Sequence, residues 1–398
     1  MNNDLLIQNV RPMAGSAVDV LIRDGRINEL GAGLTASGVE AVDGDNAILI
    51  PGLVEAHTHL DKSLLGLPWY KNEVGPRLID KITNERENKK RLGIEPQRQS
   101  ERQAILSAAK GSTHIRSHVD VDTTHGLEGI LGVAATQEKL ADVIDIEIVA
   151  FPQSGMLIRP GTVELMEQAL AHGADVVGGL DPAGIDRDPK GHLDTIFAMA
   201  ERHGKPLDIH LHEAGELGAF SMELIIERTE ALGMQGRVTI SHAFCLGMNN
   251  PAYVAELIDG LARARVHIMT TGPAARLAPP VKQLRAAGVV VCSGSDGIRD
   301  TWGPYGNADM LERAMFVGLA NNLRRDDELA LALEICTHGG AEVMALADYG
   351  LAPGCKADLV LLAGETVAEA VVTRAPRKLV VKGGRITARD GVSQRAAP

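Results

Sequence analysis

The sequence is poor in aromatic residues, which make up only 3% of its 398 positions, so its core must be aliphatic. It has only four cysteines, which lie far apart and form no CxxC pair. This excludes a disulfide framework as the organising principle and is typical of reduced intracellular thiols. No Lys/Arg run of the nucleic-acid-binding type is present, and the net charge of −12 disfavours a phosphate-binding surface.

Long apolar segments are also missing. No run approaches the roughly 18 residues needed to span a bilayer. The N-terminus MNNDLLIQNV has no basic region followed by an apolar one, as an export signal would have. We therefore expect a cytoplasmic protein with neither a membrane nor a nucleic acid as its partner. The chain is long enough for a large barrel with a small companion domain.

Both ends of the chain consist of short strand-like runs separated by turns. The first fifty residues cluster β-branched residues around Asp-Gly pairs, and the last fifty contain KADLVLLAG and RKLVVKGGRITARDG. Insertion of one domain into another is tolerated where chain ends lie close together. We therefore predict that residues 1–52 and 350–398 form one small β-sandwich domain around a separate domain of residues 53–349.

The middle of the chain alternates short apolar runs with helix-like segments such as TVELMEQALAHG, several of which end in glycine. Eight strand candidates occur there: AILIPGLVEAHTH, STHIRSHVDVD, VIDIEIVAFPQ, ADVVGGLDPA, PLDIHLHE, RVTISHAF, RVHIMTTGP and GVVVCSGSDG. Eight strand–helix alternations predict an α/β fold of the (β/α)8, or TIM barrel, type.

Polar side chains stand at the C-terminal ends of nearly all these strand candidates. In chain order they are His57, His59, His118, Asp120, Asp122, Gln153, Asp181, His210, His212, Glu213, His242 and Asp296. The C-terminal ends of barrel strands converge on one mouth, where active sites lie. The sequence therefore predicts a polar site at this mouth.

His57 and His59 are separated by one residue, so on a strand both side chains point the same way. An isolated HxH pair has a high false-positive rate, and two hydrogen-bonded histidines without a metal explain it equally well. Addition of His210 and Asp296 from other strands makes three imidazoles and one carboxylate. This donor set suits one zinc or similar divalent ion with room for water, so we predict a metal site.

These motifs resemble the amidohydrolase superfamily, most closely its cytosine deaminase-like branch, which also contains the N-isopropylammelide aminohydrolases. The resemblance covers almost the whole chain, including PGLVEAHTHLDKS, RSHVDVD, FPQSG, GGLDPA, GMQGRVTISHA and DGIRDTWGPYGNADMLERA. It implies one divalent metal, zinc or iron, held by His57, His59, His210 and Asp296. No lysine ends the fourth strand candidate, which argues against the two-metal version with a carbamylated lysine.

The resemblance also implies roles around the metal. Glu213 would shuttle a proton, His242 would stand beside the hydrolytic water, and Gln153 and Trp302 would line the substrate pocket, where His212 is expected to touch substrate. Each role has a local alternative. Glu213 also suits the first turn of a helix, and His242 a core position bonded to the backbone. Gln153 also suits a polar loop, and Trp302 a lid or core position.

The chemistry expected is hydrolysis of an exocyclic C–N bond on a planar heterocycle, a cytosine-like pyrimidine or an amino-s-triazine. A metal lowers the pKa of bound water from 15.7 to about 7. Asp296 can accept the water's proton, although SGSDG would also serve as a turn. The alternatives are a cyclic amide hydrolase of the dihydropyrimidinase type and a catalytically inactive binding protein. The predicted partner is the small heterocyclic substrate. Proteins that this barrel resembles often assemble, so a homo-oligomer is the other expected partner.

Three further features bear on the substrate and the mouth. Gly297 stands where cytosine deaminases often carry an acidic residue, which argues against cytosine itself. The pair His210 and His212 resembles the triazine aminohydrolase, whereas Glu213 does not. Residues 71–94 are long and charged, which favours a solvated helix, with a lid over the mouth as the alternative.

Overall fold

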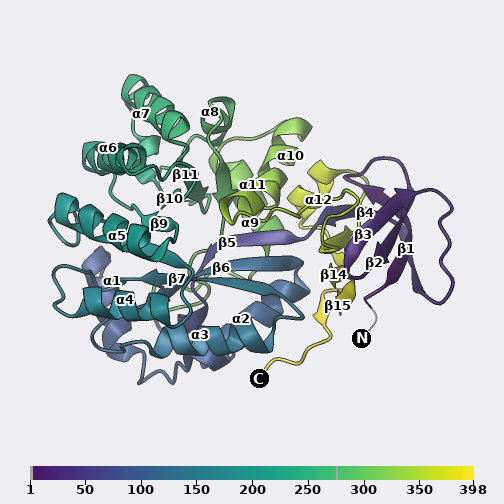
Figure 1. Cartoon of the computed structure of the whole chain (residues 1–398), viewed down its shortest axis with the longest axis horizontal. Helices are drawn as coiled ribbons and strands as arrows, with labels where there is room; N and C mark the ends of the chain where they lie inside the picture. The colour runs from purple at the N-terminus through teal and green to yellow at the C-terminus, as the bar shows by residue number, and fades with distance from the viewer. Residues whose placement is uncertain (1–2, 275–276) are drawn as a thin grey trace.

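The computed structural model describes residues 3–274 and 277–398, which form two β-sheets flanked by helices (Figure 1). The larger sheet has eight parallel strands arranged in chain order, and each coincides with one of the strand candidates. They are β5 (Leu53–Thr58), β6 (Ser112–Asp120), β7 (Asp145–Phe151), β8 (Val176–Leu180), β9 (Leu207–His210), β10 (Val238–Ser241), β11 (His267–Thr270) and β12 (Val291–Ser293). The predicted α/β barrel is confirmed.

The first and last strands of this sheet meet at the end where the candidate site lies. Thr58 and Asp296 form a parallel bridge. The amide of Asp296 donates to the His57 carbonyl at 2.9 Å, and Thr58 Oγ1 donates to the Asp296 carbonyl at 2.9 Å. Closure of the barrel therefore places Asp296, which follows the last strand, beside His57 and His59 at the end of the first strand.

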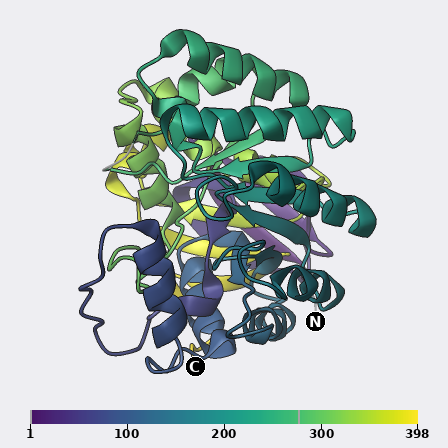
Figure 2. The ribbon, with the colours of Figure 1, turned by 90° about the vertical axis from the view of Figure 1, so that its left-hand side faces the viewer.

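Helices cover the outside of the barrel (Figures 1 and 2). They are α2 (Pro96–Ala109), α3 (Glu128–Lys139), α4 (Thr162–Ala171), α5 (Pro189–His203), α6 (Gly215–Ala231), α7 (Pro251–Ala264), α8 (Val281–Ala286), α9 (Met310–Ala320), α10 (Asp326–Glu334) and α11 (His338–Val343). α5 and α7 begin with proline, and the side chains of Asp188 and Asn250 cap them. Within the described ranges, no helix is both long and apolar enough to cross a membrane.

Three short elements interrupt the alternation. The 3-10 turn η1 (Leu60–Lys62) directly follows His59, the first residue after β5, and η2 (Phe244–Gly247) follows β10. Between η1 and α2 stands α1 (Leu78–Asn88), whose preceding loop projects beside the barrel in Figure 2. This is the charged segment 71–94 of the sequence.

The smaller sheet joins both ends of the chain, as predicted. Its order is β16-β15-β14-β13-β4-β1-β2-β3, and Leu49 of β4 lies opposite Leu361 of β13. The strands are β1 (Leu5–Pro12), β2 (Val18–Arg23), β3 (Arg26–Gly31), β4 (Glu40–Pro51), β13 (Leu359–Leu362), β14 (Arg377–Lys382), β15 (Arg385–Arg389) and β16 (Val392–Ser393); the helix α12 (Val367–Thr373) lies between β13 and β14.

The smaller sheet folds over so that its two halves touch. Gly25, in the turn between β2 and β3, lies against Gly383 in the turn after β14. A Cβ atom on Gly25 would lie 2.8 Å from the carbonyl oxygen of Gly383, so this contact requires glycine. Alternation along β4 serves two cores: Leu49 joins the apolar cluster of the small domain, while Ile48 and Ile50 join that of the barrel. β4 leads directly into β5, so the small domain adjoins the N-terminal end of β5, away from the candidate site.

Candidate active site

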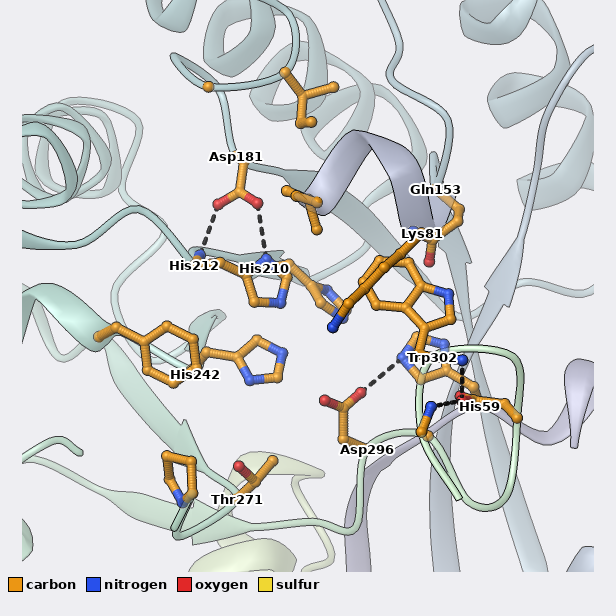
Figure 3. A pocket seen from close by; sticks show the side chains of 18 of the residues that line it. His59, Lys81, Gln153, Asp181, His210, His212, His242, Thr271, Asp296 and Trp302 are labelled. Atoms are coloured by element: carbon orange, nitrogen blue, oxygen red, sulfur yellow. Dashed lines mark hydrogen bonds and ion pairs between the residues drawn. The ribbon is translucent and has the colours of Figure 1, made fainter. Parts of the chain in front are cut away.

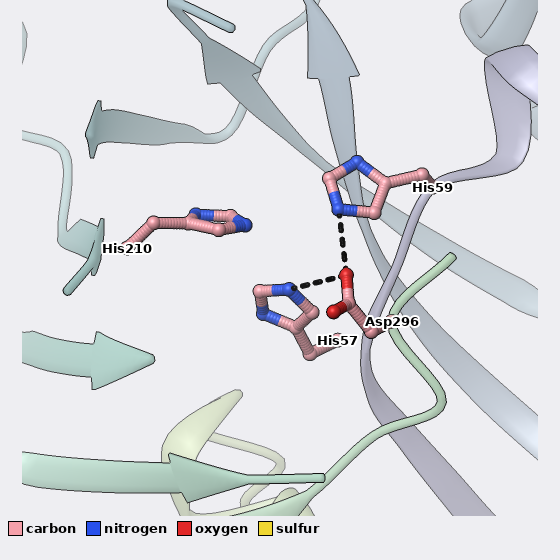
Figure 4. Close-up of side chains that lie close together, drawn as sticks. All are labelled: His57, His59, His210 and Asp296. Atoms are coloured by element: carbon pink, nitrogen blue, oxygen red, sulfur yellow. Dashed lines mark hydrogen bonds and ion pairs between the residues drawn. The ribbon is translucent and has the colours of Figure 1, made fainter. Parts of the chain in front are cut away.

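The four predicted metal ligands converge at the C-terminal ends of the barrel strands (Figure 4). His57, His59, His210 and Asp296 can each offer one ligand atom, and these atoms lie within 4.8 Å of one another. His59 Nε2 lies 3.1 Å and His57 Nε2 lies 3.7 Å from Asp296 Oδ1. The structure therefore brings together residues that are up to 239 positions apart (296 − 57).

Polar groups behind His57 and His59 determine which ring nitrogen of each faces this group. Ser241 Oγ donates to Asp208 Oδ1 at 2.6 Å and lies 3.0 Å from His57 Nδ1, so it must accept the proton of that nitrogen. His59 Nδ1 lies 2.9 Å from the carbonyl oxygen of His118, to which it can only donate. Both Nε2 atoms therefore keep their lone pairs for a ligand.

The burial and charge of these side chains fit a divalent metal. His57 Nε2 and both ring nitrogens of His210 are buried, and none has a hydrogen-bond partner among the described residues. Burial lowers the pKa of His59 and His210, which keeps both rings neutral. Burial acts to raise the pKa of Asp296, but the neighbouring imidazoles of His57 and His59 outweigh it and hold the pKa well below its usual range. Three imidazoles and one carboxylate form a suitable mononuclear site.

Two other groups of acidic and histidine side chains are instead neutralised by cations of the chain. Asp208 lies 3.0 Å from Arg116 Nη1. Asp145 and Asp358 each lie 2.7 Å from Lys382 Nζ. Because a positive side chain already balances these carboxylates, neither group offers a comparable place for a metal.

The metal group borders a cavity of about 1040 Å³ (Figure 3). The cavity brings together all the residues to which the sequence assigned a metal-binding, catalytic or substrate-binding role, except His57, which is fully buried. These residues are His59, Gln153, His210, His212, Glu213, His242, Asp296 and Trp302. Its apolar lining includes Leu78, Ile79, Phe151, Ile158, Ile185 and Phe244. A half-apolar cavity with converging polar groups is what a small organic ligand requires.

Left-handed backbone conformations turn three of these side chains into the cavity. Asp181, His242 and Asp296 follow the ends of β8, β10 and β12 with φ values of 35°, 73° and 63°. Such angles are unusual for residues other than glycine and cluster at functional sites. The backbone strain at these three residues is therefore the cost of turning their side chains into the cavity.

His212 is held in place by a carboxylate from the neighbouring strand end. Its Nδ1 lies 2.7 Å from Asp181 Oδ2, and its backbone amide donates to Asp181 Oδ1 at 2.6 Å (Figure 3). The His212 ring stacks on that of His242, with the centroids 4.3 Å apart. A histidine oriented through Nδ1 by a carboxylate can carry a proton at its other nitrogen. The sequence placed His212 in the pocket but did not identify Asp181 as its partner.

Glu213 lines the cavity, but its carboxylate is already engaged by the chain. Oε1 accepts the amides of Ala183 and Gly184 at 2.9 and 2.6 Å, and Oε2 accepts Ser221 Oγ. Burial raises the pKa of Glu213. These bonds give it an anchoring function for the loop after β8, and its role as proton shuttle stays a prediction.

The amide of Gln153 is oriented by a buried lysine. Lys62 Nζ donates to Gln153 Oε1 at 2.9 Å. Because an ammonium group can only donate, the amide oxygen of Gln153 accepts this hydrogen bond. The NH₂ group of Gln153 is then the part that can donate to a ligand. Lys62 also lies 2.9 Å from Asp120 Oδ1 and 3.2 Å from Glu85 Oε1. Sequence analysis missed Lys62, although its position beside the HxH motif was an available signal.

One face of the segment 71–94 lines the cavity, and the other is exposed to solvent. Leu78 and Lys81 of α1 are part of the cavity wall. Glu85 and Lys89 are buried, and Lys89 Nζ lies 2.7 Å from Asp61 Oδ2. One face of this segment therefore covers the cavity as a lid would, while its other face is solvated, as its composition favours.

Gly297, where the sequence departs from the cytosine deaminase pattern, packs closely against Asp300. A Cβ atom there would lie 1.9 Å from Asp300 Oδ2, so a larger residue would require the Asp300 side chain to move. Asp300 Oδ1 in turn accepts the amides of Trp302 and Gly303 at 2.7 and 3.0 Å. The loop after Asp296 is thereby shaped to bring Trp302 to the cavity.

Comparison with known proteins agrees with this geometry. Residues 40–388 match the model of a family described as the amidohydrolase family. The chain is 32% identical to N-isopropylammelide isopropyl amidohydrolase of Pseudomonas sp. (strain ADP), over 98% of each chain.

Two solved structures are similar over nearly their full length. One is N-isopropylammelide isopropylaminohydrolase from Burkholderia multivorans ATCC 17616, with 50% identity, a TM-score of 0.95 and coverage of 98% of this chain and 99% of that one. The other is 5-methylcytosine deaminase from Klebsiella pneumoniae liganded with 5-fluorocytosine, with 28% identity, a TM-score of 0.85 and coverage of 99% and 98%.

Proposed function

The chain belongs to the amidohydrolase family, and on that premise we propose that it hydrolyses an exocyclic C–N bond of an amino-s-triazine whose amine carries an alkyl group. The products would be a ring carbonyl and a free alkylamine. The observation that carries the proposal is the group formed by His57, His59, His210 and Asp296 at the edge of a half-apolar cavity.

A divalent metal, zinc or iron, held by these four residues would supply a water molecule whose pKa is low enough to yield hydroxide near pH 7. Asp296 stays ionised and can take the proton that the water loses. His242 is kept neutral because burial lowers its pKa, and it lies at the cavity wall where it can donate to the oxygen that becomes negative. The leaving nitrogen must gain the proton that the water loses, and the pair of Asp181 and His212 can take up this proton and pass it on.

The shape and polarity of the cavity favour a substituted ring over a bare pyrimidine. Its volume, about 1040 Å³, is at the upper end of the range for small-ligand pockets. Ile158, Ile185 and Phe244 offer apolar surface for an alkyl substituent. The NH₂ group of Gln153 suits a ring carbonyl, and Trp302 offers a flat face to a planar ring. The 50% identity to N-isopropylammelide isopropylaminohydrolase supports the same choice.

Deamination of a cytosine-like pyrimidine is the second candidate. It is supported by the 28% identity to 5-methylcytosine deaminase over almost the whole chain. The two candidates share the site and the reaction and differ in the ring and the leaving group, so substrate profiling separates them.

The test is a substrate panel assayed with protein that holds one zinc or iron per chain. The panel contains N-alkylamino-s-triazine diones, their unsubstituted amino counterparts, cytosine, 5-methylcytosine and a cyclic amide such as dihydrouracil. Alkylamine and ammonia release are measured beside ring opening. We expect the highest kcat/KM for the N-alkylated triazines. Opening of the cyclic amide without any amine release would contradict the proposal and favour a cyclic amide hydrolase.

The variants H212F and E213Q assign the proton carrier. If His212 carries the proton, H212F loses kcat while E213Q keeps most of it. The reverse result would restore the role that the family resemblance implies for Glu213.

A further inference from the structure

Glu85 of α1 reaches from the lid into the wall of the cavity and touches two groups there. Its Oε1 lies 3.2 Å from Lys62 Nζ, and its Oε2 accepts the indole Nε1–H of Trp302. Lys62 in turn holds the amide oxygen of Gln153. One buried carboxyl group is therefore bonded directly or through one residue to both side chains proposed to bind the ring.

α1 contacts Trp302 in other ways as well. Lys81 Nζ lies 5.8 Å from the centre of the indole ring, and the two side chains are neighbours in Figure 3. Ile82 and Leu78 belong to the apolar cluster against which Trp302 packs. Leu78, Ile82 and Glu85 are spaced as i, i+4 and i+7, so they share one face of the helix. Only Glu85 gives the indole a directional bond.

The charges around Glu85 show why its acceptor atoms matter more than its charge. Two buried ammonium groups, Lys62 and Lys89, face two buried carboxylates, Asp61 and Asp120, at distances of 2.7 to 3.0 Å. These four charges already balance. Glu85 is a third carboxyl group in this cluster, and burial raises its pKa. A neutral side chain of the same shape therefore satisfies the site.

We propose that Glu85 is a positioning residue, which sets the indole of Trp302 and, through Lys62, the amide of Gln153 as the ring-binding surface of the cavity. The inference rests on the proposed function, since a planar heterocycle is what this surface would hold. It assigns to the lid helix a part in substrate specificity. Glu85 itself does not line the cavity.

The first test is spectroscopic and needs no substrate. The chain has two tryptophans, and Trp69 is 70% exposed, so W69F makes Trp302 the sole indole reporter. In this background E85A and E85M remove the acceptor, and E85M also keeps the volume, so that the fold is preserved. Both should shift Trp302 emission to longer wavelength, whereas E85Q should leave it near the parent position. E87Q, on an exposed position of the same helix, is the matched control.

The second test is kinetic, on whichever heterocycle the substrate panel identifies. Loss of a buried hydrogen bond that orients the ring-binding surface should raise KM about tenfold in E85M. The kcat should change less than KM, because both ground and transition states use this surface. E85Q should restore KM. Unchanged Trp302 emission and unchanged KM in E85A and E85M would overturn the proposal. If no substrate is found, the proposed function fails while the emission comparison still decides whether Glu85 holds Trp302.

Discussion

Replacement of Ser241 by alanine should weaken metal binding without touching any ligand. Ser241 is fully buried, and its Oγ connects His57 Nδ1, 3.0 Å away, to Asp208 Oδ1, 2.6 Å away. S241A leaves the Nδ1–H of His57 without an acceptor, so the ring is no longer held with Nε2 toward the site. Loss of such a partner typically lowers metal affinity about 10- to 100-fold. This corresponds to about 1.4–2.8 kcal/mol, the range expected for an unsatisfied buried polar group.

The assay is a competition for zinc between the protein and a chromophoric chelator. The matched control is S107A, because Ser107 is also fully buried but its Oγ has no hydrogen-bond partner within the described residues. We expect S107A to keep the affinity of the parent protein. An S241A protein that is folded and binds zinc as tightly as S107A would refute the argument that Ser241 orients His57.

Three further predictions follow from the same contacts. G297A should lower the free energy of unfolding by about 1–3 kcal/mol in a chemical denaturation experiment, because its Cβ would meet Asp300 Oδ2 at 1.9 Å; equal stability would show that the loop adapts. K382M should lower the free energy of unfolding by about 3 kcal/mol in the same assay, since it leaves the buried carboxylate of Asp358 without its cation. An unchanged denaturation midpoint would contradict this. H212F should reduce kcat by about 10²- to 10⁴-fold in an amine-release assay with little change in KM, and full activity would exclude it as proton carrier.

The barrel could be predicted from the sequence because its strands are short apolar runs that end in turn residues. The run AILIPGLVEAHTH shows the limit of that signal, since it divides between β4 of the small domain and β5 of the barrel. Hydrophobicity does not change at Pro51 and Gly52, because both strands are buried. The pairing of β4 with β1 and β13 separates them, and the contact with β13 joins residues more than 300 positions apart.

The metal group could be predicted because His57 lies on β5, His59 directly follows its last residue, and barrel geometry places other strand ends beside them. The residues that orient the histidines could not be predicted from the sequence. Asp181 and His212 meet across two adjacent strands, and Ser241 meets His57 across the interior of the barrel. A serine or an aspartate at a strand end is compatible with many partners, and the register of the strands decides which one it meets.

The lid segment shows why charge composition alone misleads. Residues 71–94 contain many charged side chains, and in most proteins such a stretch is solvated. Glu85 and Lys89, however, are four residues apart and turn to the same face of α1, where Lys62 and Asp120 neutralise them. The partners that make this burial tolerable stand beside the metal motif and at the end of β6, far from α1 in the sequence. A buried face can therefore carry charges wherever the fold supplies opposite ones, and at this site those charges connect the lid to the groups that face the substrate.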